Sequence, residues 1–476
     1  MHIPCRIVML CFVWTSSLVA ASKPNIIYIL ADDLGYGDLG CYGQKTLKTP
    51  NLDRMAREGM RFTRHYAGST VCAPSRCVLM TGLHTGHARI RGNGPGQLLP
   101  GDVTFAKVLQ QHGYQTGCFG KWGIGSPPPL DDPQRHGFDE FYGYINMYHA
   151  HNYYPEFMIH NGRKVPLRNV LYDDWRAKRT GPREGAGVSR VATDYAPHLI
   201  ADRMLGYIRD CAKQKDKPFF VYYALNIPHA NNEGGGEKRI ERNGMRVPDW
   251  GSHANLDMPD QEKGFARMID YIDRDVGNIL ALLKELGIDN NTIVMFSSDN
   301  GPHQEGGHKM PFFDSNGPLR GMKRDLYEGG IRVPFIVAGP SVKPGSVCTL
   351  PVTGLDILPT LADLADYQEP LPSNIDGGSM RAVLHNEGKG MIQRANPFLV
   401  FHQAVDRTAI SAIRLGDFKL VKTWKKDRLE LFDLSKDISE ANDLSRQNPM
   451  QTEKLHSLLS DFLKQVGAET RRTKKK

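Results

Sequence analysis

Four runs of apolar residues along the chain have the length of a β-strand, and each leads into polar residues. The first run is apolar at odd and even positions alike, as expected for a central strand of a parallel sheet. Sites in open α/β sheets form at the carboxyl ends of strands, so we expect one edge of this sheet to carry the chemistry. The runs are Asn25–Ala31, Gln115–Phe119, Pro218–Leu225 and Thr292–Phe296, and they lead into Asp32-Asp33, Lys121, His229 and Asp299-Asn300.

Segments with the apolar spacing of helices alternate with these runs. Phe105–His112 and Asp194–Lys213 are two of them, and a third has apolar residues at core spacing from Met268 to Leu283, with Gly287 as a C-cap. The alternation predicts an α/β fold with a large, mainly parallel sheet flanked by helices. Two stretches without clear periodicity, roughly 126–190 and the one ending near Asp260, are predicted to be functional insertions.

The pattern changes from about residue 370. Short strand-like runs at 398–402, 409–415, 419–424 and 429–434 precede an amphipathic helix at 451–466. This order predicts a smaller antiparallel sheet with one helix. We therefore expect a catalytic domain at 22–370 and a C-terminal α+β subdomain at 371–476, consistent with a chain too long for one small core.

The first 21 residues are typical of a secretory signal peptide. Arg6 supplies a short basic region, Ile7–Ala20 is apolar, and small residues follow for cleavage. The apolar run is shorter than the ~20 residues that span a bilayer, and nothing later in the chain is long enough. We expect an exported protein without a membrane span, either periplasmic or extracellular.

Composition narrows the candidate chemistry only a little. The net charge of +8 comes partly from the tail after residue 470, so we give it little weight and expect no nucleic-acid partner. Eight cysteines are present, two of them within the signal peptide, and none forms a C-x-x-C pair. The sequence therefore predicts neither a disulfide scaffold nor a zinc site.

The run from Val71 to Gly82, V-C-A-P-S-R-C-V-L-M-T-G, is the most informative stretch. Pro74 suits the first turn of a helix, which places Cys72 near a helix N-terminus, where anions are favoured. Arg76 lies four residues on and projects from the same face as Cys72. An isolated pair of this kind is more often a buried cysteine beside a surface arginine.

The full run resembles the maturation signature of the sulfatases, C-x-P-S-R followed by T-G. The family belongs to the alkaline-phosphatase-like superfamily, and within it the chain resembles arylsulfatase A and the N-acetylgalactosamine-sulfatases. The resemblance implies that Cys72 is oxidised to formylglycine, whose hydrate attacks sulfur. It also implies a maturation partner, either a formylglycine-generating enzyme or an anaerobic sulfatase-maturating enzyme.

Hard oxygen ligands at two strand ends suit calcium. Asp32, Asp33, Asp299 and Asn300 have no accompanying histidine or cysteine cluster, and calcium prefers roughly six to eight oxygens. A lone Asp-Asp pair is more often a turn or a helix cap, but the second strand end favours a metal. The resemblance assigns the same four positions, together with modified Cys72, to one calcium ion.

The resemblance also assigns roles to cationic residues. Lys121 and Lys323 match the lysines that hold the sulfate and the leaving oxygen, and His229 matches the histidine that can protonate the departing alcohol. Arg76 would stabilise the aldehyde hydrate. His87, in a polar segment, is expected to help line the substrate pocket.

One position departs from the family pattern. Many sulfatases carry G-K-W-H, whose histidine is the proposed base of the release step, and this chain has Gly123 instead. His151 or His149, in the predicted insertion, could replace it, and ordinary loop histidines are an equally good interpretation. We place His151 in the candidate site for catalysis and substrate binding.

These features predict a calcium-dependent formylglycine sulfatase that acts on a sulfated saccharide. One alternative is a phosphoesterase on the same scaffold, which would favour a Ser or Thr nucleophile and histidine-bound metals. Another is a non-catalytic protein that binds sulfated glycans, an interpretation that only Gly123 favours.

Overall fold

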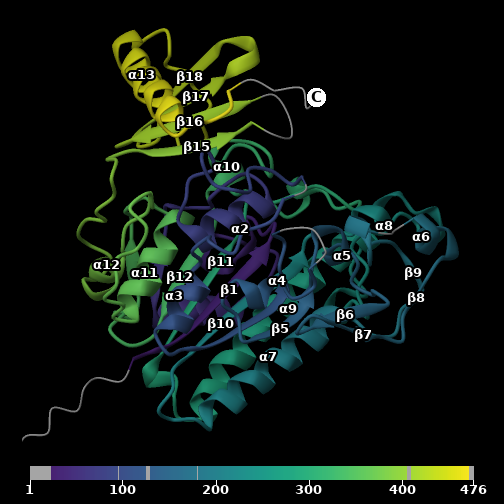
Figure 1. The fold of residues 1–476 in the computed structure, drawn as a ribbon. Helices are drawn as coiled ribbons and strands as arrows, with labels where there is room; N and C mark the ends of the chain where they lie inside the picture. Colours follow the sequence, from purple (N-terminus) through teal and green to yellow (C-terminus); the bar gives the residue numbers. More distant parts are fainter. Residues whose placement is uncertain (1–22, 95, 125–128, 179–180, 405–408, 471–476) are drawn as a thin grey trace, which may run out of the picture.

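The computed structural model describes residues 23–94, 96–124, 129–178, 181–404 and 409–470. A ten-stranded mixed sheet forms its centre, in the order β13-β2-β12-β11-β1-β10-β4-β5-β6-β7 (Figure 1). These strands are β1 (Asn25–Asp32), β2 (Met60–Phe62), β4 (Gln115–Lys121), β5 (Glu140–Tyr144), β6 (Phe157–His160), β7 (Arg163–Pro166), β10 (Phe219–Pro228), β11 (Thr292–Ser298), β12 (Phe335–Ala338) and β13 (Ser346–Cys348). Two small pairings join β3 (His65–Tyr66) to β14 (Val352–Thr353) and β8 (Val170–Leu171) to β9 (Ser189–Val191).

The central strands are parallel, and β1 lies between β10 and β11. All eight residues of β1 are buried, as its continuous apolar run predicts. Its side chains alternate between the two faces: Ile27 and Ile29 belong to one core, and Ile26 and Tyr28 to the other. The predicted large, mainly parallel sheet is confirmed, with antiparallel strands added towards both edges.

Helices cover both faces of the sheet. One core contains residues of α1 (Pro50–Glu58), α7 (Ala196–Ala212) and α9 (Asp260–Glu285), and the other contains residues of α2 (Cys72–Thr81), α3 (Phe105–Gln111), α11 (Ile357–Leu364) and α12 (Arg381–His385). The shorter helices are α4 (Asp132–Arg135), α5 (Met147–Ala150), α6 (Asp173–Lys178), α8 (Asn232–Gly236) and α10 (Glu328–Ile331). No helix within the described ranges is both long and apolar enough to cross a bilayer.

The C-terminal unit is the predicted antiparallel sheet with one helix. It contains β15 (Leu399–Gln403), β16 (Ile410–Leu415), β17 (Phe418–Thr423), β18 (Arg428–Asp433) and α13 (Pro449–Gln465) (Figure 1). One face packs on α13, and the other packs on the segment around α10. The boundary at residue 370 stays a prediction; α12, which follows it, contributes Val383 to the core of the large sheet.

The stretch 126–190 is more regular than the sequence indicated. Within its described part, β5 pairs with β4 in parallel, and β6 and β7 extend the sheet in antiparallel fashion. The prediction of an irregular insertion was therefore wrong for these strands, because their short runs carry no clear alternation. The predicted signal peptide, residues 1–21, lies outside the described residues.

Candidate active site

The carboxyl ends of β1 and β11 bring the predicted acidic residues together. Ala31 is in register with Ser298, so Asp32 and Asp33, at the end of β1, lie beside Asp299 and Asn300, which follow β11. Asp33 has a left-handed backbone (φ 67°), and its N–H donates to Asp299 Oδ1 at 3.1 Å. All four side chains are buried. The parallel register thus builds the acidic cluster that the sequence predicted.

Cys72 is the first residue of α2, and it faces this cluster. Its Sγ lies 3.3 Å from Asp32 Oδ1 and 3.8 Å from Asp33 Oδ1. Burial and the charge of Asp32 raise the pKa of the Cys72 thiol. One turn later, Arg76 is fully buried and bonds Asp299 Oδ2 through two nitrogens, each at 2.9 Å. The predicted shared helix face is therefore confirmed, although Arg76 lies in the core rather than on the surface.

Two buried lysines flank the carboxylates. Lys121 Nζ donates to Asp32 Oδ2 at 2.6 Å, and Lys323 Nζ donates to Asp33 Oδ2 at 2.7 Å. Although burial opposes ionisation, the charges of Lys121 and Arg76 hold the pKa of Asp32 well below its usual range. Lys121 ends a strand and Lys323 lies in a loop 202 residues later, so only the fold brings both lysines to the adjacent carboxylates of Asp32 and Asp33.

His229 joins the cluster through Lys323. Its Nδ1 is 2.7 Å from Ala230 O, a contact in which Nδ1 must donate, so Nε2 accepts from Lys323 Nζ at 3.1 Å. His229 Nε2 also lies 3.5 Å from Asp33 Oδ2. Burial and the charge of Lys323 lower the pKa of His229 well below its ordinary value. The neutral ring therefore presents Nε2 to the centre of the site.

The residues of this cluster fit a divalent cation. Ligand atoms of Asp32, Asp33, Cys72 and His229 lie within 4.8 Å of one another. Asn300 Oδ1 is buried beside them and has no hydrogen-bond partner among the described residues, a state that usually costs free energy. Burial and Asp32 also raise the pKa of Asp299 to about 7, which shows how crowded the carboxylates are. Carboxylate and amide oxygens are the donors that calcium prefers.

His151 reaches the same cluster from the segment after α5. Its ring is stacked on that of His229, with centroids 4.8 Å apart and planes inclined by 15°. Its Nδ1 lies 3.1 Å from Glu233 Oε2. His149 instead points into the core, where its Nε2 donates to Phe157 O at 2.9 Å and burial lowers its pKa to about 4. Only His151 of the two histidines lies at the site.

Gly123 has a structural reason for being glycine. Its backbone is left-handed (φ 68°), and a Cβ there would lie 3.0 Å from Arg76 Cδ and 3.3 Å from Lys121 Cγ. A histidine at this position would therefore be strained and would push on two residues of the site. A side chain at position 123 would need Arg76 and Lys121 to shift by a few tenths of an ångström, in addition to the strain of the left-handed backbone.

His87 is placed elsewhere. In the loop after α2, its Nε2 lies 2.7 Å from Asp376 Oδ2, so the described hydrogen-bond partner of its ring is outside the acidic cluster. Its substrate-binding role stays a prediction. Sequence reasoning missed Glu305, whose Oε2 lies 3.3 Å from Lys323 Nζ, and Glu233 beside His151. Both residues lie soon after a strand, since β11 ends at Ser298 and β10 ends at Pro228, and this position alone could have pointed to them.

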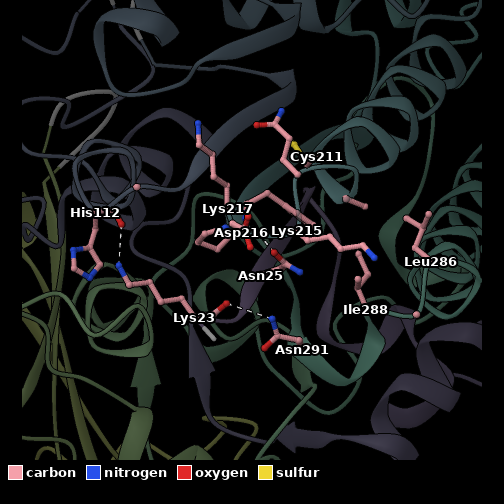
Figure 2. A pocket seen from close by; sticks show the side chains of 16 residues that line it. Lys23, Asn25, His112, Cys211, Lys215, Asp216, Lys217, Leu286, Ile288 and Asn291 are labelled. Carbon is pink, nitrogen blue, oxygen red and sulfur yellow. Dashed lines mark hydrogen bonds between the residues drawn. The ribbon is translucent and has the colours of Figure 1, made fainter. Parts of the chain in front are cut away.

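A cavity of about 750 Å³ lies at the opposite edge of the sheet (Figure 2). Asn25 and Phe219, the first residues of β1 and β10, line it. Lys23 Nζ donates to His112 O, just after α3 ends, and Lys215 follows the end of α7. Cations are favoured at helix C-termini, which accounts for the basic lining. None of the predicted site residues lines this cavity.

Comparison with known proteins agrees with this geometry. The sulfatase family profile matches residues 24–367, and the profile of the C-terminal region of N-sulphoglucosamine sulphohydrolase matches residues 321–468. The chain is 30% identical over 500 residues to N-acetylgalactosamine-6-O-sulfatase of Bacteroides thetaiotaomicron, covering 92% of this chain and 93% of the relative. It is 33% identical over 423 residues to human arylsulfatase A, with 85% and 76% covered.

Solved structures resemble the whole chain. The crystal structure of Ps i-CgsB in complex with k-i-k-neocarrahexaose superposes with a TM-score of 0.76 at 26% identity, covering 94% of both chains. The match includes the C-terminal unit as well as the large sheet, because so little of either chain is left out. With a buried cysteine, two lysines and an acidic cluster at one strand edge, this chain belongs to the sulfatase family of alkaline-phosphatase-like enzymes and hydrolyses sulfate esters.

Proposed function

We propose that this sulfatase releases sulfate from a sulfated saccharide, with formylglycine at position 72 and one calcium ion. The observation that carries the proposal is the position of Cys72 Sγ, 3.3 Å from Asp32 Oδ1, in a buried cluster flanked by Lys121 and Lys323. An anionic ester group entering this cluster meets cations on both sides. A sugar substrate is supported by the similarity to the N-acetylgalactosamine-6-O-sulfatase.

A calcium ion and the oxidation of residue 72 to formylglycine complete the proposed site. Asp32, Asp33, Asp299, Asn300 and residue 72 would hold the calcium ion, which supplies Lewis-acid polarisation, and formylglycine supplies the hydroxyl nucleophile of an aldehyde hydrate. The unpaired Asn300 Oδ1 supports the metal, since a buried carbonyl oxygen without a donor is an available ligand. Arg76 orients Asp299 and lies behind residue 72.

The remaining residues bind the ester and manage its protons. Lys121 and Lys323 contact the oxygens of the sulfate group. Lys323, which lies next to His229, also contacts the bridging oxygen that departs with the alcohol. His229 Nε2 accepts a hydrogen bond from Lys323 Nζ, so it would take up a proton from that lysine and pass it to the departing oxygen. His151, stacked on His229 and held by Glu233, is the base we propose in place of the family histidine that Gly123 excludes.

The maturation partner and the compartment belong to the same proposal. Oxidation of Cys72 requires a formylglycine-generating enzyme or an anaerobic sulfatase-maturating enzyme, and a signal peptide at 1–21 would direct the protein to the periplasm or the medium. We propose N-acetylgalactosamine 6-sulfate as the first substrate to try, because a relative matched over 92% of this chain bears that specificity in its name.

The decisive experiment combines peptide mass with sulfate release. Trypsin cleaves after Arg76, so Cys72 and Cys77 fall into separate peptides of one digest. In protein from the native host we expect the Cys72 peptide to be lighter than its thiol form and reactive towards a hydrazide, while the Cys77 peptide keeps its thiol. Sulfate release from N-acetylgalactosamine 6-sulfate should disappear in Cys72→Ala. An unmodified Cys72 in protein that still releases sulfate would defeat the proposal.

A further inference from the structure

Glu305 and Arg324 form an ion pair beside the buried cluster. Arg324 Nη1 lies 2.5 Å from Glu305 Oε1, and Glu305 Oε2 lies 3.3 Å from Lys323 Nζ and 4.0 Å from His229 Nε2. Both residues come from the segment between β11 and α10. The carboxylate is thus next to the lysine and the histidine that serve the leaving oxygen in the proposed function.

This pair is the more open part of the site. The side chains of Glu305 and Arg324 are 17% and 32% exposed, whereas those of Lys323 and His229 are 2% and 4% exposed. A molecule that entered from solvent with its sulfate ester on Lys323 would therefore leave the rest of its body against Glu305. In that position Glu305 would contact the leaving group of the substrate rather than its sulfate.

The backbone of Arg324 is strained in the conformation that places its side chain beside Glu305. Arg324 has a left-handed backbone (φ 81°), and its N–H donates to Thr70 O at 3.0 Å, two residues before Cys72. Non-glycine residues in this region of backbone conformation are strained and concentrate at functional sites. Neutralising Lys323 does not require Glu305, because Asp33 Oδ2 already lies at 2.7 Å from the same nitrogen.

We infer that Glu305 is a specificity residue that accepts a hydrogen bond from the substrate hydroxyl nearest to the sulfated oxygen. A carboxylate has about four lone-pair positions, and Arg324 and Lys323 engage only one oxygen each, so acceptor capacity remains towards the opening. The inference rests on the proposed function. It selects sugars with a free hydroxyl beside the ester and disfavours a second sulfate there, because two anions would face each other.

A cycle of two proteins and two substrates tests the inference. The substrates are N-acetylgalactosamine 6-sulfate and its 4-deoxy analogue, and the proteins are the mature wild type and Glu305→Ala. Charge-assisted hydrogen bonds are worth roughly 10- to 100-fold. We expect Glu305→Ala to lower kcat/KM by that factor on the parent sugar and by less than about 3-fold on the deoxy analogue. An equal loss on both substrates would show that Glu305 only supports Lys323, and would overturn the inference.

Charge is tested separately. Glu305→Gln keeps the shape of the side chain and removes its charge, so it should improve the ratio of kcat/KM for N-acetylgalactosamine 4,6-disulfate over the 6-sulfate. Glu184→Gln, which breaks an exposed ion pair with Lys164, is the matched control and should leave this ratio of kcat/KM unchanged. An unchanged ratio in Glu305→Gln would count against the inference.

Two further outcomes are distinguishable. If the mature wild type releases no sulfate from any sulfated sugar, the proposed function fails before any variant is compared. Glu305 could instead be a metal ligand, since its carboxylate lies within 4.8 Å of ligand atoms of Asp33 and His303. Glu305→Ala should therefore keep the calcium-dependent rise in Tm of the wild type, and loss of that rise would overturn the assignment to the sugar.

Discussion

The imidazole rings of His151 and His229 lie nearly parallel, with centroids 4.8 Å apart, although 78 residues separate them in the chain. The contact brings a residue of the predicted insertion next to the histidine that presents Nε2 to Lys323. Glu233 Oε2 lies 3.1 Å from His151 Nδ1, a hydrogen bond that orients the ring. A second titratable ring is therefore within reach of the ester, where the family's usual histidine has no room.

We expect His151→Ala to lower kcat on the true substrate by about 10²-fold or more, the usual cost of losing a general base. KM should change less, because the lysines that hold the sulfate are intact. Initial rates of sulfate release at a series of N-acetylgalactosamine 6-sulfate concentrations give both kcat and KM. His149→Ala is a poor neutral control, since His149 is buried and its loss leaves a cavity, so His149→Gln is the better comparison. Turnover at the parental rate in His151→Ala would exclude the role.

Removal of the metal should abolish activity and lower stability together. Exhaustive chelation is expected to stop sulfate release, and calcium should restore it better than zinc, because the ligand oxygens are hard. Binding to the native state alone raises stability by about 2.7 kcal/mol at a hundred times Kd, so Tm should rise with calcium concentration. Asp299→Ala should show no such rise. A calcium-independent Tm combined with full activity after chelation would rule out the metal site.

Restoring the family histidine at position 123 should harm the protein. Gly123→His places a bulky side chain at φ 68° with its Cβ 3.0 Å from Arg76 Cδ, so strain of about 1–3 kcal/mol and displacement of Arg76 are expected. Activity and Tm should both fall. Gly113→His, at another left-handed glycine with open space around it, reports the backbone strain alone. A gain in kcat from Gly123→His would show that the backbone adapts.

The C-terminal sheet is bound to the loop of Lys323 through a buried ion pair. Lys419 Nζ lies 2.9 Å from Glu328 Oε1 and 2.9 Å from Glu440 Oε1, and Glu440 Oε2 accepts from the N–H of Glu328 at 2.6 Å. Although burial opposes ionisation, Lys419, Arg332 and Arg414 lower the pKa of Glu328 from 4.5 to about 2. The carboxylate of Glu328, which connects this loop to the C-terminal sheet, is therefore ionised at neutral pH.

A lowered carboxyl pKa stabilises the folded state above pH 4.5, and that contribution is lost as the pH falls towards 2. Burial raises the pKa of Glu440, which gives linkage of the opposite sign, so the two must be separated by mutation. Glu328→Gln should lower Tm at pH 7, since breaking a buried pair costs about 3–5 kcal/mol, and should flatten the decline of Tm below pH 4.5. Glu387→Gln, in an exposed ion pair, is the control. Parallel Tm–pH curves for wild type and Glu328→Gln would contradict this.

Much of the site could be predicted because it stands at strand ends. Asp32 and Asp299 each follow a continuous apolar run, and parallel neighbours end at the same edge of a sheet, so pattern alone placed them together. The C-terminal sheet was predictable for a similar reason, since its strands are short and separated by turns. Cys72 and Arg76 needed only helical spacing to share a face.

Other features depend on contacts that leave no periodic signal. Glu305 sits in a loop where no spacing relates it to Lys323, and the strands β6 and β7 alternate too weakly to be recognised. The φ of Gly123 is equally invisible in the sequence, because glycine is compatible with most backbone angles. The burial of Arg76 could not be foreseen, since its partner Asp299 is 223 residues away.

All ten residues of α2 are buried, Cys72 among them at 1% exposure, so the proposed oxidation of Cys72 would have to precede folding of this segment. A maturation enzyme would reach the thiol only while the segment is still open, and a chain that folds first would keep an unmodified thiol. The neighbours that close over Cys72 extend to Asp299, 227 residues later. At about 5–20 residues per second, synthesis of that stretch takes roughly 10–45 s. If Cys72 is oxidised as proposed, the active fraction of a preparation would report the rate of oxidation relative to the rate of folding, and slower synthesis of the second half of the chain should raise it.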